Sequence, residues 1–453
     1  MSDHKEAKSF SRFGYIMVAA GAAIGLGNIW KFPYLAYGDG GGAFVLIYIV
    51  ICILLGHPIV QAEQAVGRRG RASAAASYGV IHPKWRFVGV INIVCTFLID
   101  IYYLVVSGWV LKYFVTYVVS GDFGKDKQAY FDNYISSTTQ PLIYSLIIIA
   151  IIVFLPFLLG LRILLRKLQK VIMPMLAVLL LVCGIYALIV VPGAVDGLKY
   201  YFVPDFSKFG MQQFADACMQ VCFSVGIGWG IFTTLGASMD KDANLKADAW
   251  WVDICDTFIA LLAGFVIIPT VVGTGSEMSS GPSLVFVAMT QIFETLPGGR
   301  IIGIFFFASL IFAVISTFFT ILEIPRMYVQ EKTHTSHQVS LIITAALVYG
   351  GSVLCSLSKG ILSWLKLPWP SFQGIAYYDI YDWCDCLSGY VLLPLGVLLT
   401  CFYIVKAWGF NEYEKELTNN GKHGKLSMYD KVSLAVICPV LTLIVILHVF
   451  GFI

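Results

Sequence analysis

Two glycine-rich runs stand inside long apolar stretches of the sequence, at residues 21–28 and 223–230. Glycine weakens a helix, and in lipid each freed backbone carbonyl or amide must find another polar partner. A helix that unwinds at such a run presents oxygen and amide groups that hold ions or a polar substrate inside a membrane. For the first run alone, close packing of two helices is an equally good interpretation.

The spacing of the two runs favours the binding interpretation. They fall in the first and the sixth predicted membrane helices, so the two runs are five spans apart. Interruptions at corresponding places in two five-helix halves are typical of transporters built from an inverted repeat. An odd number of crossings between equivalent positions inverts the second half relative to the first.

The composition requires a membrane around these runs. Of 453 residues, 58% are apolar and only 13% are charged, and the mean hydropathy is +0.81. Soluble chains carry about a quarter charged residues, so a soluble domain, a disordered chain and a disulfide scaffold are all excluded. The net charge of +3 and the scattered lysines and arginines give no support for a nucleic-acid partner.

The uncharged stretches predict an all-α membrane protein with about eleven transmembrane helices and a single transporter domain. We expect a first five-helix repeat over 12–192, an inverted second repeat over 211–408 and an additional helix over 429–451, with helices 1 and 6 discontinuous. The eleven predicted helices lie near residues 12–38, 42–70, 87–119, 140–158, 164–192, 211–238, 249–273, 299–329, 339–357, 379–408 and 429–451.

Loop charges predict the orientation of these helices. With the amino terminus inside, the first two cytoplasmic loops carry nine lysines and arginines, from Arg68 to Lys170, and the first two outer loops carry four. The first span continues past Trp30 without a small-residue cleavage site, which predicts a retained helix rather than a signal peptide. Eleven spans then place the carboxyl terminus outside. Short outer loops without an Asn-x-Ser/Thr acceptor favour a bacterial inner membrane.

Several motifs together resemble the neurotransmitter:sodium symporter family. They are the run 21–28 with Trp30-Lys31-Phe32-Pro33-Tyr34, the loop 38–44, the pair Tyr102-Tyr103, the run 223–230 and the segment 313–317. The similarity covers about ten of the eleven spans. It implies a sodium-coupled symporter of the bacterial leucine-transporter type that works by alternating access, with two sodium ions carried alongside the substrate.

The resemblance implies a first sodium site with hard oxygen ligands. The matching positions are the Ala23 carbonyl, Asn28, Ser224 and Asp256, with the substrate carboxylate completing the shell. Asp256 departs from the family, in which an Asn is common and chloride is often needed nearby.

The residues that match the chloride site are incomplete in this chain. Tyr48, Gln220 and Ser224 are present, but Ala260 stands where a serine hydroxyl would be. Because a carboxylate at Asp256 supplies the negative charge that chloride otherwise brings, we expect chloride-independent transport.

A second sodium site is implied by carbonyls of the first helix and by the eighth helix. Residues 313, 316 and 317 share one helix face, so a carbonyl and two hydroxyls converge. Serine and threonine hydroxyls in membrane helices also often bond back to their own backbone, which is the alternative. The expected ligands are Gly21, Ile24, Ala313, Ser316 and Thr317.

The substrate class follows from Gly25, which replaces the aspartate of the family's amine transporters. Free backbone amides at residues 25–27 suit a substrate carboxylate, and the Tyr103 hydroxyl would donate to it, so we expect a zwitterionic amino acid. Because the residues that would line the side-chain pocket are nearly all apolar, we expect its side chain to be hydrophobic or aromatic. The predicted substrate-binding residues are Ala23, Gly25, Leu26, Gly27, Ile99, Tyr103, Phe223, Ser224, Gly226, Trp229, Phe318 and Ile321.

The resemblance also places gates and leaves some acids without a role. Lys31 and Asp385 match an outer pair, with Lys in place of the usual Arg. Glu331 matches an inner gate acid, whose partner would be Lys5 or Lys8. The remaining membrane acids are Asp100, Asp216 and Asp253, for which structural pairing and a proton-linked role are both open.

Other functional classes lack their signatures. An intramembrane enzyme would need a nucleophile elbow or paired histidines, and the sequence contains neither HExxH nor GxSxG, so no enzyme activity is expected. A passive channel is the second alternative. The expected partners are a small amino acid and membrane lipid, and no sequence feature indicates an oligomeric state.

Overall fold

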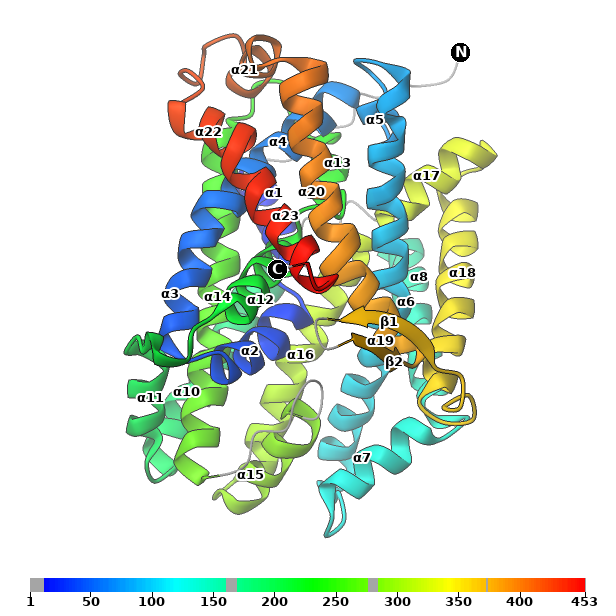
Figure 1. The fold of residues 1–453 in the computed structure, drawn as a ribbon. Helices are drawn as coiled ribbons and strands as arrows, with labels where there is room; N and C mark the ends of the chain where they lie inside the picture. The colour runs from blue at the N-terminus through cyan, green and yellow to red at the C-terminus, as the bar shows by residue number, and fades with distance from the viewer. Residues whose placement is uncertain (1–11, 160–168, 276–283, 372–373, 453) are drawn as a thin grey trace.

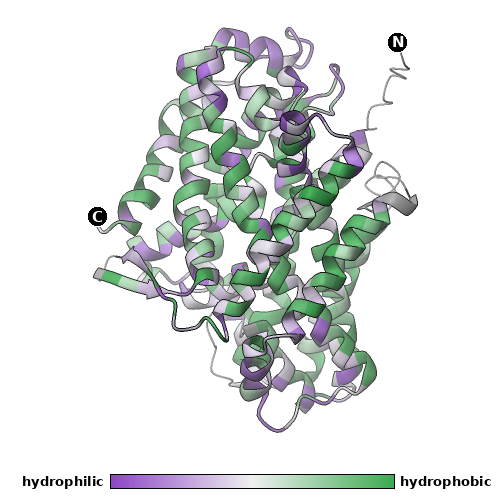
Figure 2. Ribbon diagram, turned by 90° about the vertical axis from the view of Figure 1, so that its right-hand side faces the viewer, coloured by the Kyte–Doolittle hydropathy of each residue, from purple (hydrophilic) through white to green (hydrophobic). Residues whose placement is uncertain are grey.

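The computed structural model describes residues 12–159, 169–275, 284–371 and 374–452. Within these ranges nine helices are long and apolar enough to cross a membrane, and two bent pairs raise the number to eleven. The predicted all-helical bundle is therefore confirmed. Apolar residues dominate the middle of the bundle and polar residues gather at both ends (Figure 2).

The first half of the chain supplies the first break and five spans (Figure 1). Its elements are α1 (Arg12–Ala23), η1 (Gly27–Lys31), α2 (Phe32–Gly38), α3 (Gly42–Ile51), η2 (Cys52–Gly56), α4 (His57–Gly70), α5 (Ala74–Tyr78), η3 (Pro83–Trp85), α6 (Arg86–Val119), α7 (Lys127–Ser136), α8 (Gln140–Leu159), α10 (Gln169–Val190) and α11 (Ala194–Phe202).

The second half supplies the second break and the remaining spans. Its elements are η5 (Phe206–Lys208), α12 (Met211–Val221), η6 (Cys222–Gly226), α13 (Ile231–Gly236), α14 (Leu245–Thr274), η7 (Leu284–Ala288), α15 (Met289–Thr295), α16 (Gly299–Ile321), α17 (Glu323–Thr333), α18 (His337–Ser358), β1 (Leu367–Ser371), β2 (Gly374–Tyr378), α19 (Ile380–Cys386), η8 (Leu387–Leu392), α20 (Leu393–Phe402), η9 (Tyr403–Trp408), α21 (Phe410–Thr418), α22 (Met428–Val432), η10 (Ser433–Ile437) and α23 (Cys438–Val449).

The only regular sheet among the described residues is an antiparallel pair that the sequence analysis does not predict. Strands β1 and β2 pair from Leu367 with Tyr378 to Ser371 with Gly374. They lie beside α19, on the side of the bundle toward α7 (Figure 1). Prolines at 368 and 370 suit a short ladder with a free edge.

The first predicted interruption is confirmed. Helix α1 ends at Ala23, η1 begins at Gly27, and the axis bends by 56° between the two parts. The carbonyls of Gly21 and Ile24 no longer continue a helical ladder at this point and instead accept hydrogen bonds from another helix. The backbone of the break is thus satisfied by tertiary contacts, as lipid requires.

The second interruption separates η6 from α13 and is built on glycine. Gly226, Gly228 and Gly230 have φ angles of 86°, 81° and 83°. Residues with a Cβ adopt such angles at a cost, so three alternating glycines let the chain unwind without strain. The Gly228 amide, freed from the helix, donates to Glu63 Oε1 at 2.7 Å.

Helix α13 lies directly against α4, backbone to backbone. A Cβ added at Gly67 would stand 2.0 Å from the Thr233 carbonyl oxygen, and one at Gly236 would stand 2.5 Å from the Gln64 carbonyl oxygen. No side chain fits at either contact. The α13 half of the sixth span is therefore fixed to the second span by glycine-mediated packing.

Asp39 follows α2 outside the membrane-crossing helices and gives a pH-dependent contribution to stability. Burial, followed by the nearby Asp216 carboxylate, raises the pKa of Asp39 to about 7, whereas an unfolded aspartate has a pKa of about 3.9. The folded chain holds the proton more tightly, so this contribution is complete below about pH 4 and is lost as the pH rises through about 7.

We expect the melting temperature of the purified protein to fall between pH 5 and pH 8 by more than that of an Asp39→Asn variant. Thermal unfolding followed by tryptophan fluorescence at both pH values measures the difference. Asp132→Asn, on the exposed side of α7, is the control. Equal pH dependence in the wild type and Asp39→Asn would contradict the assignment.

Candidate functional site

The two interrupted helices face each other across a small enclosed cavity. Its volume is about 10 Å³, room for about one water molecule. Amino-acid binding thus requires the surrounding side chains to part. The cavity is lined by Ala22, Ala23, Gly25, Leu26, Gly27, Asn28, Tyr103, Phe223, Gly226, Trp229, Ile231 and Thr317.

Eight of the twelve predicted substrate-binding residues line this cavity, and the structure adds Ala22 and Ile231. Neither has a chemical signal in the sequence, because both are apolar residues in an apolar helix. Ile231 begins α13, and its Cδ1 would lie 2.8 Å from a Cβ added at Gly226. Gly226 thus leaves the space that Ile231 occupies.

The amides of the first break are partly engaged, although the sequence analysis expects them to be free. The Gly25 amide donates to Asn28 Oδ1 at 3.0 Å, and the Leu26 amide donates to the Tyr103 hydroxyl at 3.4 Å. The Tyr103 hydroxyl accepts this bond, and a hydroxyl can also donate its own hydrogen to a carboxylate. A Cβ at Gly25 would stand 3.0 Å from Thr317 Oγ1, so only glycine leaves this approach open.

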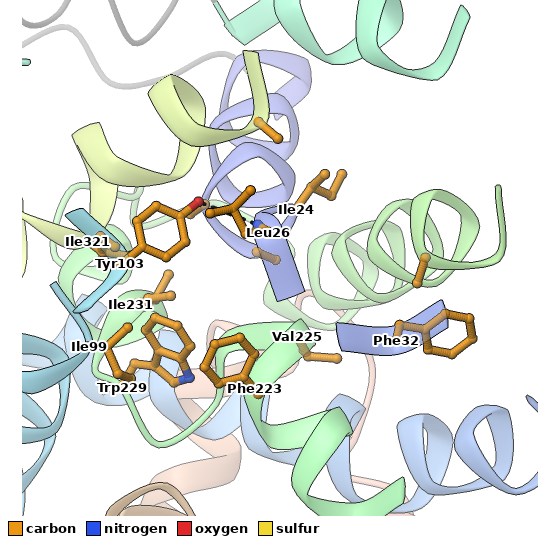
Figure 3. Close-up of a cluster of buried hydrophobic side chains, with 14 of the residues drawn as sticks. Ile24, Leu26, Phe32, Ile99, Tyr103, Phe223, Val225, Trp229, Ile231 and Ile321 are labelled. Carbon is orange, nitrogen blue, oxygen red and sulfur yellow. Dashed lines mark hydrogen bonds between the residues drawn. The ribbon is translucent and has the colours of Figure 1, made fainter. Parts of the chain in front are cut away.

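Aromatic rings form the walls around the cavity (Figure 3). The rings of Phe223 and Trp229 pack with centroids 5.2 Å apart, and Tyr103 stacks on Phe318 at 5.7 Å. Ile99 and Ile321 lie beside these rings in the same cluster. They do not border the small cavity itself, and they form the next layer of the wall.

Asp256 gathers the side chains predicted for the first sodium site. Its Oδ1 accepts from Asn28 Nδ2 at 2.6 Å, and its Oδ2 accepts from the Ser224 hydroxyl at 2.9 Å. All three side chains are almost fully buried. Two hard oxygen donors and a carboxylate within hydrogen-bond distance of one another suit a small monovalent cation.

Two of the three side chains that match the family's chloride position, Tyr48 and Ser224, contact the same carboxylate. The Tyr48 hydroxyl donates to Ser224 Oγ at 3.1 Å and to Asp256 Oδ2 at 3.3 Å. Gln220 Nε2 donates to the Gly27 carbonyl at 3.1 Å. Tyr48 and Ser224 therefore face a fixed negative charge inside the protein, whereas Gln220 contacts the broken first span.

The oxygens predicted for the second sodium site also converge. Ser316 Oγ donates to the Gly21 carbonyl at 2.8 Å, and Thr317 Oγ1 donates to the Ile24 carbonyl at 2.8 Å. Ala313, one turn earlier on α16, is buried. The two hydroxyls thus bond to carbonyls of the broken helix. A cation between these oxygens would replace the hydrogen bonds.

Lys31 and Asp385 form the outer pair. The Lys31 ammonium lies 3.3 Å from Asp385 Oδ1 and 4.6 Å from the centre of the Phe223 ring. Through Lys31 the pair therefore covers the Phe223 ring of the aromatic wall. The ammonium side chain is 12% exposed and the carboxylate side chain is 33% exposed, so the interaction is screened in part by water.

We expect Asp385→Asn to weaken apparent substrate affinity about 3- to 5-fold, because a partly exposed ion pair contributes up to about 1 kcal/mol. Saturation of sodium-dependent amino-acid binding measures this change. Asp382→Asn, in the same helix but paired with Lys359 at 2.9 Å, is the matched control. An unchanged affinity in Asp385→Asn would exclude this gating role.

Glu331, the predicted inner gate acid, pairs with a residue that the sequence analysis does not propose. Arg86 Nη2 donates to Glu331 Oε1 at 2.8 Å, and the Ser73 hydroxyl donates to Oε2. Lys5 and Lys8, the predicted partners, lie outside the described residues. In the sequence, Arg86 is recognisable only as a basic residue of a predicted cytoplasmic loop. It lies 245 residues from Glu331 along the chain, so the sequence does not show that the two residues meet.

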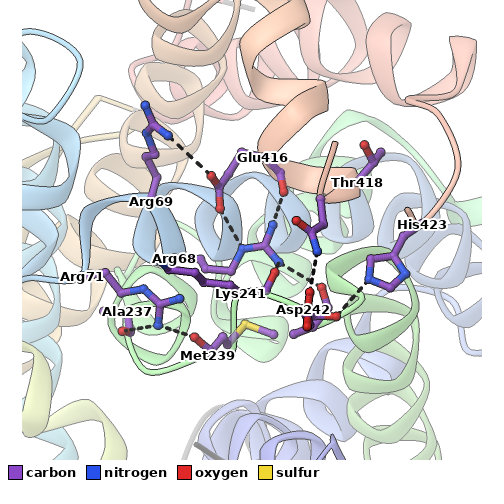
Figure 4. A network of polar contacts seen from close by, with 12 residues as sticks. Arg68, Arg69, Arg71, Ala237, Met239, Lys241, Asp242, Glu416, Thr418 and His423 are labelled. Atoms are coloured by element: carbon purple, nitrogen blue, oxygen red, sulfur yellow. Dashed lines mark hydrogen bonds and ion pairs between the residues drawn. The ribbon is translucent and has the colours of Figure 1, made fainter. Parts of the chain in front are cut away.

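Further ionic contacts close the same side. Arg12 contacts Asp248 at 2.8 Å. Arg68 donates to Glu416 Oε1 at 2.7 Å and to the carbonyl of Ala243 at 2.9 Å, at the centre of a network that joins α4 to α21 (Figure 4). Ionic contacts are therefore formed both at Lys31 and Asp385 and at the helix ends near Glu331 and Glu416.

Two of the three unexplained acids have partners. Asp216 accepts from Tyr390 at 3.2 Å, and Asp253 Oδ2 lies 2.8 Å from His57 Nδ1. Asp100 is fully buried and has no hydrogen-bond partner among the described residues. Glu63, which the sequence analysis misses, is buried and accepts from the amide of the second break.

Comparisons with known proteins identify a family for the whole chain. The model of the sodium:neurotransmitter symporter family matches residues 7–121 and 132–452. An uncharacterized sodium-dependent transporter, YhdH of Bacillus subtilis (strain 168), is 30% identical over 100% of this chain and 99% of its own length. Another, from Haemophilus influenzae, is 30% identical over 90% of this chain and 91% of its own.

A solved structure is also similar over nearly its whole length. It is the crystal structure of MhsT in complex with L-phenylalanine, with a TM-score of 0.87, 31% identity, and coverage of 97% of this chain and 99% of that one. On the family match and the full-length relatives, this chain belongs to the sodium:neurotransmitter symporter family.

Proposed function

We propose that the protein couples inward movement of two sodium ions to uptake of a hydrophobic or aromatic zwitterionic amino acid. The observation that carries the proposal is the convergence of Gly21 and Ile24 carbonyls with Ser316 and Thr317 hydroxyls at the break of the first span. The apolar aromatic wall supports the substrate class, and the MhsT structure holds L-phenylalanine.

Transport proceeds by alternating access. Sodium binds at the two clusters, the substrate carboxylate meets the Tyr103 hydroxyl and the first cation, and the outer pair closes before the inner contacts open. Each sodium charge that moves inward through 100 mV releases about 2.3 kcal/mol, enough to drive concentrative uptake. The repeats over 12–192 and 211–408, with 429–451 additional, would rock against each other, and no enzymatic step is involved.

Purified protein in liposomes tests this function. Labelled phenylalanine should accumulate against its gradient only when sodium is higher outside, which a channel or a hydrolase does not produce. Accumulation that is equal in sodium and in choline would refute the proposal.

Chloride independence is proposed on the Asp256 carboxylate and its Tyr48 and Ser224 donors. Uptake should be unchanged when chloride is replaced by gluconate. Uptake that collapses in gluconate would refute this part alone. We propose a bacterial plasma membrane location, with lipid around the bundle, the amino terminus in the cytoplasm and the carboxyl terminus outside.

A further inference from the structure

A cavity of about 620 Å³ lies at the end of the bundle where α1 begins, beside the polar network of Figure 4. It shares no lining residue with the small cavity between the interrupted helices. Its volume is in the range of pockets that hold small organic molecules. Five basic side chains and two carboxylates line it, so three positive charges are in excess.

The two carboxylates of this cavity are already engaged by two of its cations. Glu416 Oε1 accepts from Arg68 Nε at 2.7 Å, and Glu412 Oε1 lies 2.6 Å from the Lys415 ammonium. Arg69 reaches Glu416 only at 4.0 Å, and its side chain is 53% exposed. Arg69 gains little from this contact, because a long ion pair at the surface is weak.

The other two cations, Arg71 and Lys241, form no ion pair in the part of the chain that the structure describes. The Arg71 guanidinium donates to the carbonyls of Ala237 and Met239, which carry no formal charge. Burial, followed by the neighbouring Arg68 charge, lowers the pKa of Arg71. The positive charge of this wall is therefore offset only in part by the nearby carboxylates.

Arg71 also occupies an unusual backbone position. It ends α4 with a φ angle of 54°, in the left-handed region that glycine and asparagine adopt most easily. A residue with a long side chain is held there at a cost in conformational energy. The helix end itself therefore does not explain why a guanidinium stands at this wall of the cavity.

The cavity lies at the depth of the lipid headgroups. Two membrane-crossing segments, Gly42–Gly70 and Ile380–Trp408, end at its wall, with Arg69 and Trp408 among their last residues. Tryptophan and basic residues gather at such span ends, where the phosphate groups of a bilayer also lie. Val80 and Trp408 add apolar surface to the cavity. A ligand with an anionic group and an apolar or neutral part suits this combination.

We propose that the cavity is a binding site for an organic phosphate, whose phosphate group is held by Arg69, Arg71 and Lys241. A guanidinium fork matches two phosphate oxygens, and an ammonium adds a point charge. A phosphate monoester carries about 1.5 to 2 negative charges at pH 7 and three acceptor oxygens, so it meets the excess charge better than a carboxylate does. Its source is the headgroup of an anionic phospholipid or a soluble phosphate ester, since both present this group.

The ligand would join two parts of the chain that are far apart in the sequence. Arg69 and Arg71 belong to the end of α4, whereas Lys241 lies in the loop between α13 and α14. None of the three touches the sodium clusters or the aromatic wall. The inference therefore goes beyond the proposed function and does not depend on it.

Calorimetric titration of the purified full-length protein, in a neutral detergent at constant low ionic strength, tests the proposal. Glycerol 3-phosphate is the probe for a soluble source, and dihexanoyl phosphatidic acid is the probe for a lipid source. We expect saturable binding of at least one of them. Binding of both indicates a site for the phosphate group alone, and binding of the lipid alone indicates a headgroup site, so either result supports the inference.

The variant Arg71→Gly removes the guanidinium and suits the φ angle of 54°, so the fold should be unaffected. Its affinity for the bound probe should fall at least about 10-fold, the effect of one charge-assisted hydrogen bond. Lys241→Gln should weaken binding in the same direction. Lys84→Gln, which removes an exposed cation outside the cavity, is the matched control and should bind as the wild type does.

Three results would overturn the inference. The first is the absence of saturable binding of both probes to the wild type. The second is an unchanged affinity in both Arg71→Gly and Lys241→Gln. The third is an equal loss of affinity in Lys84→Gln, which would show a general attraction to the basic face of the protein instead of a site.

Discussion

Uptake by an Asp256→Asn variant is expected to fall about 100-fold or more in chloride-free buffer. The Asp256 carboxylate accepts hydrogen bonds from Asn28, Ser224 and Tyr48 and would be the only fixed negative charge beside the first cation. Removing one partner of a buried charge pair costs about 3–5 kcal/mol, which corresponds to at least about 100-fold in sodium affinity. Sodium-dependent uptake of labelled amino acid in gluconate buffer measures the loss.

Chloride should not rescue this variant on its own. Ala260, one turn after Asp256 and fully buried, offers no hydroxyl to an anion. An Asp256→Asn/Ala260→Ser double variant adds that donor to Tyr48 and Ser224, so uptake should return only when chloride is present. Asp253→Asn, in the same helix but paired with His57, is the control and should stay indifferent to chloride. Full activity of Asp256→Asn in gluconate would disprove the assigned role.

The second large effect is expected at the other sodium cluster. In a Ser316→Ala/Thr317→Ala double variant, the two hydroxyls that meet the Gly21 and Ile24 carbonyls are lost. Each hydroxyl that contacts a charged group contributes about 1.5–3 kcal/mol. We expect the half-saturating sodium concentration for uptake to rise about 100-fold.

A buried serine on the same helix provides the control for this variant. Ser309 donates to the carbonyl of Phe306 at 2.6 Å, within its own helix. Ser309→Ala removes a buried hydroxyl from α16 without touching the broken span, so its sodium dependence should match the wild type. A normal sodium dependence in the double variant would show that these oxygens do not bind the ion.

The sequence predicts the helices and the breaks well, because lipid leaves the backbone few choices. A glycine-rich run inside an apolar stretch has to be satisfied by polar groups, and in the structure Ser316 and Thr317 satisfy it. The sequence likewise predicts that polar groups surround Asp256, since a carboxylate in a membrane helix needs partners. The resemblance, rather than spacing, pointed to Asn28 and Ser224 as those partners.

Other features depend on distances that the sequence does not encode. The pairing of Glu331 with Arg86 joins two helix ends through the reach of a long side chain. The part played by Ile231 follows from the turn at Gly226, which decides where α13 begins. The short strand pair β1 and β2 forms in a loop whose composition reads as irregular, and the isolation of Asp100 emerges only once its neighbours are placed.

The glycine contacts of α13 have a mechanical consequence. Because Gly67 and Gly236 bring two backbones together with no side chains between them, α13 should move together with α4 as one rigid unit. The three glycines that precede α13 form a hinge, so α12 can move independently of this rigid unit. A covalent cross-link between α4 and α13 should then leave transport turnover unchanged, whereas a cross-link between α12 and α13, across the hinge, should stop the transport cycle.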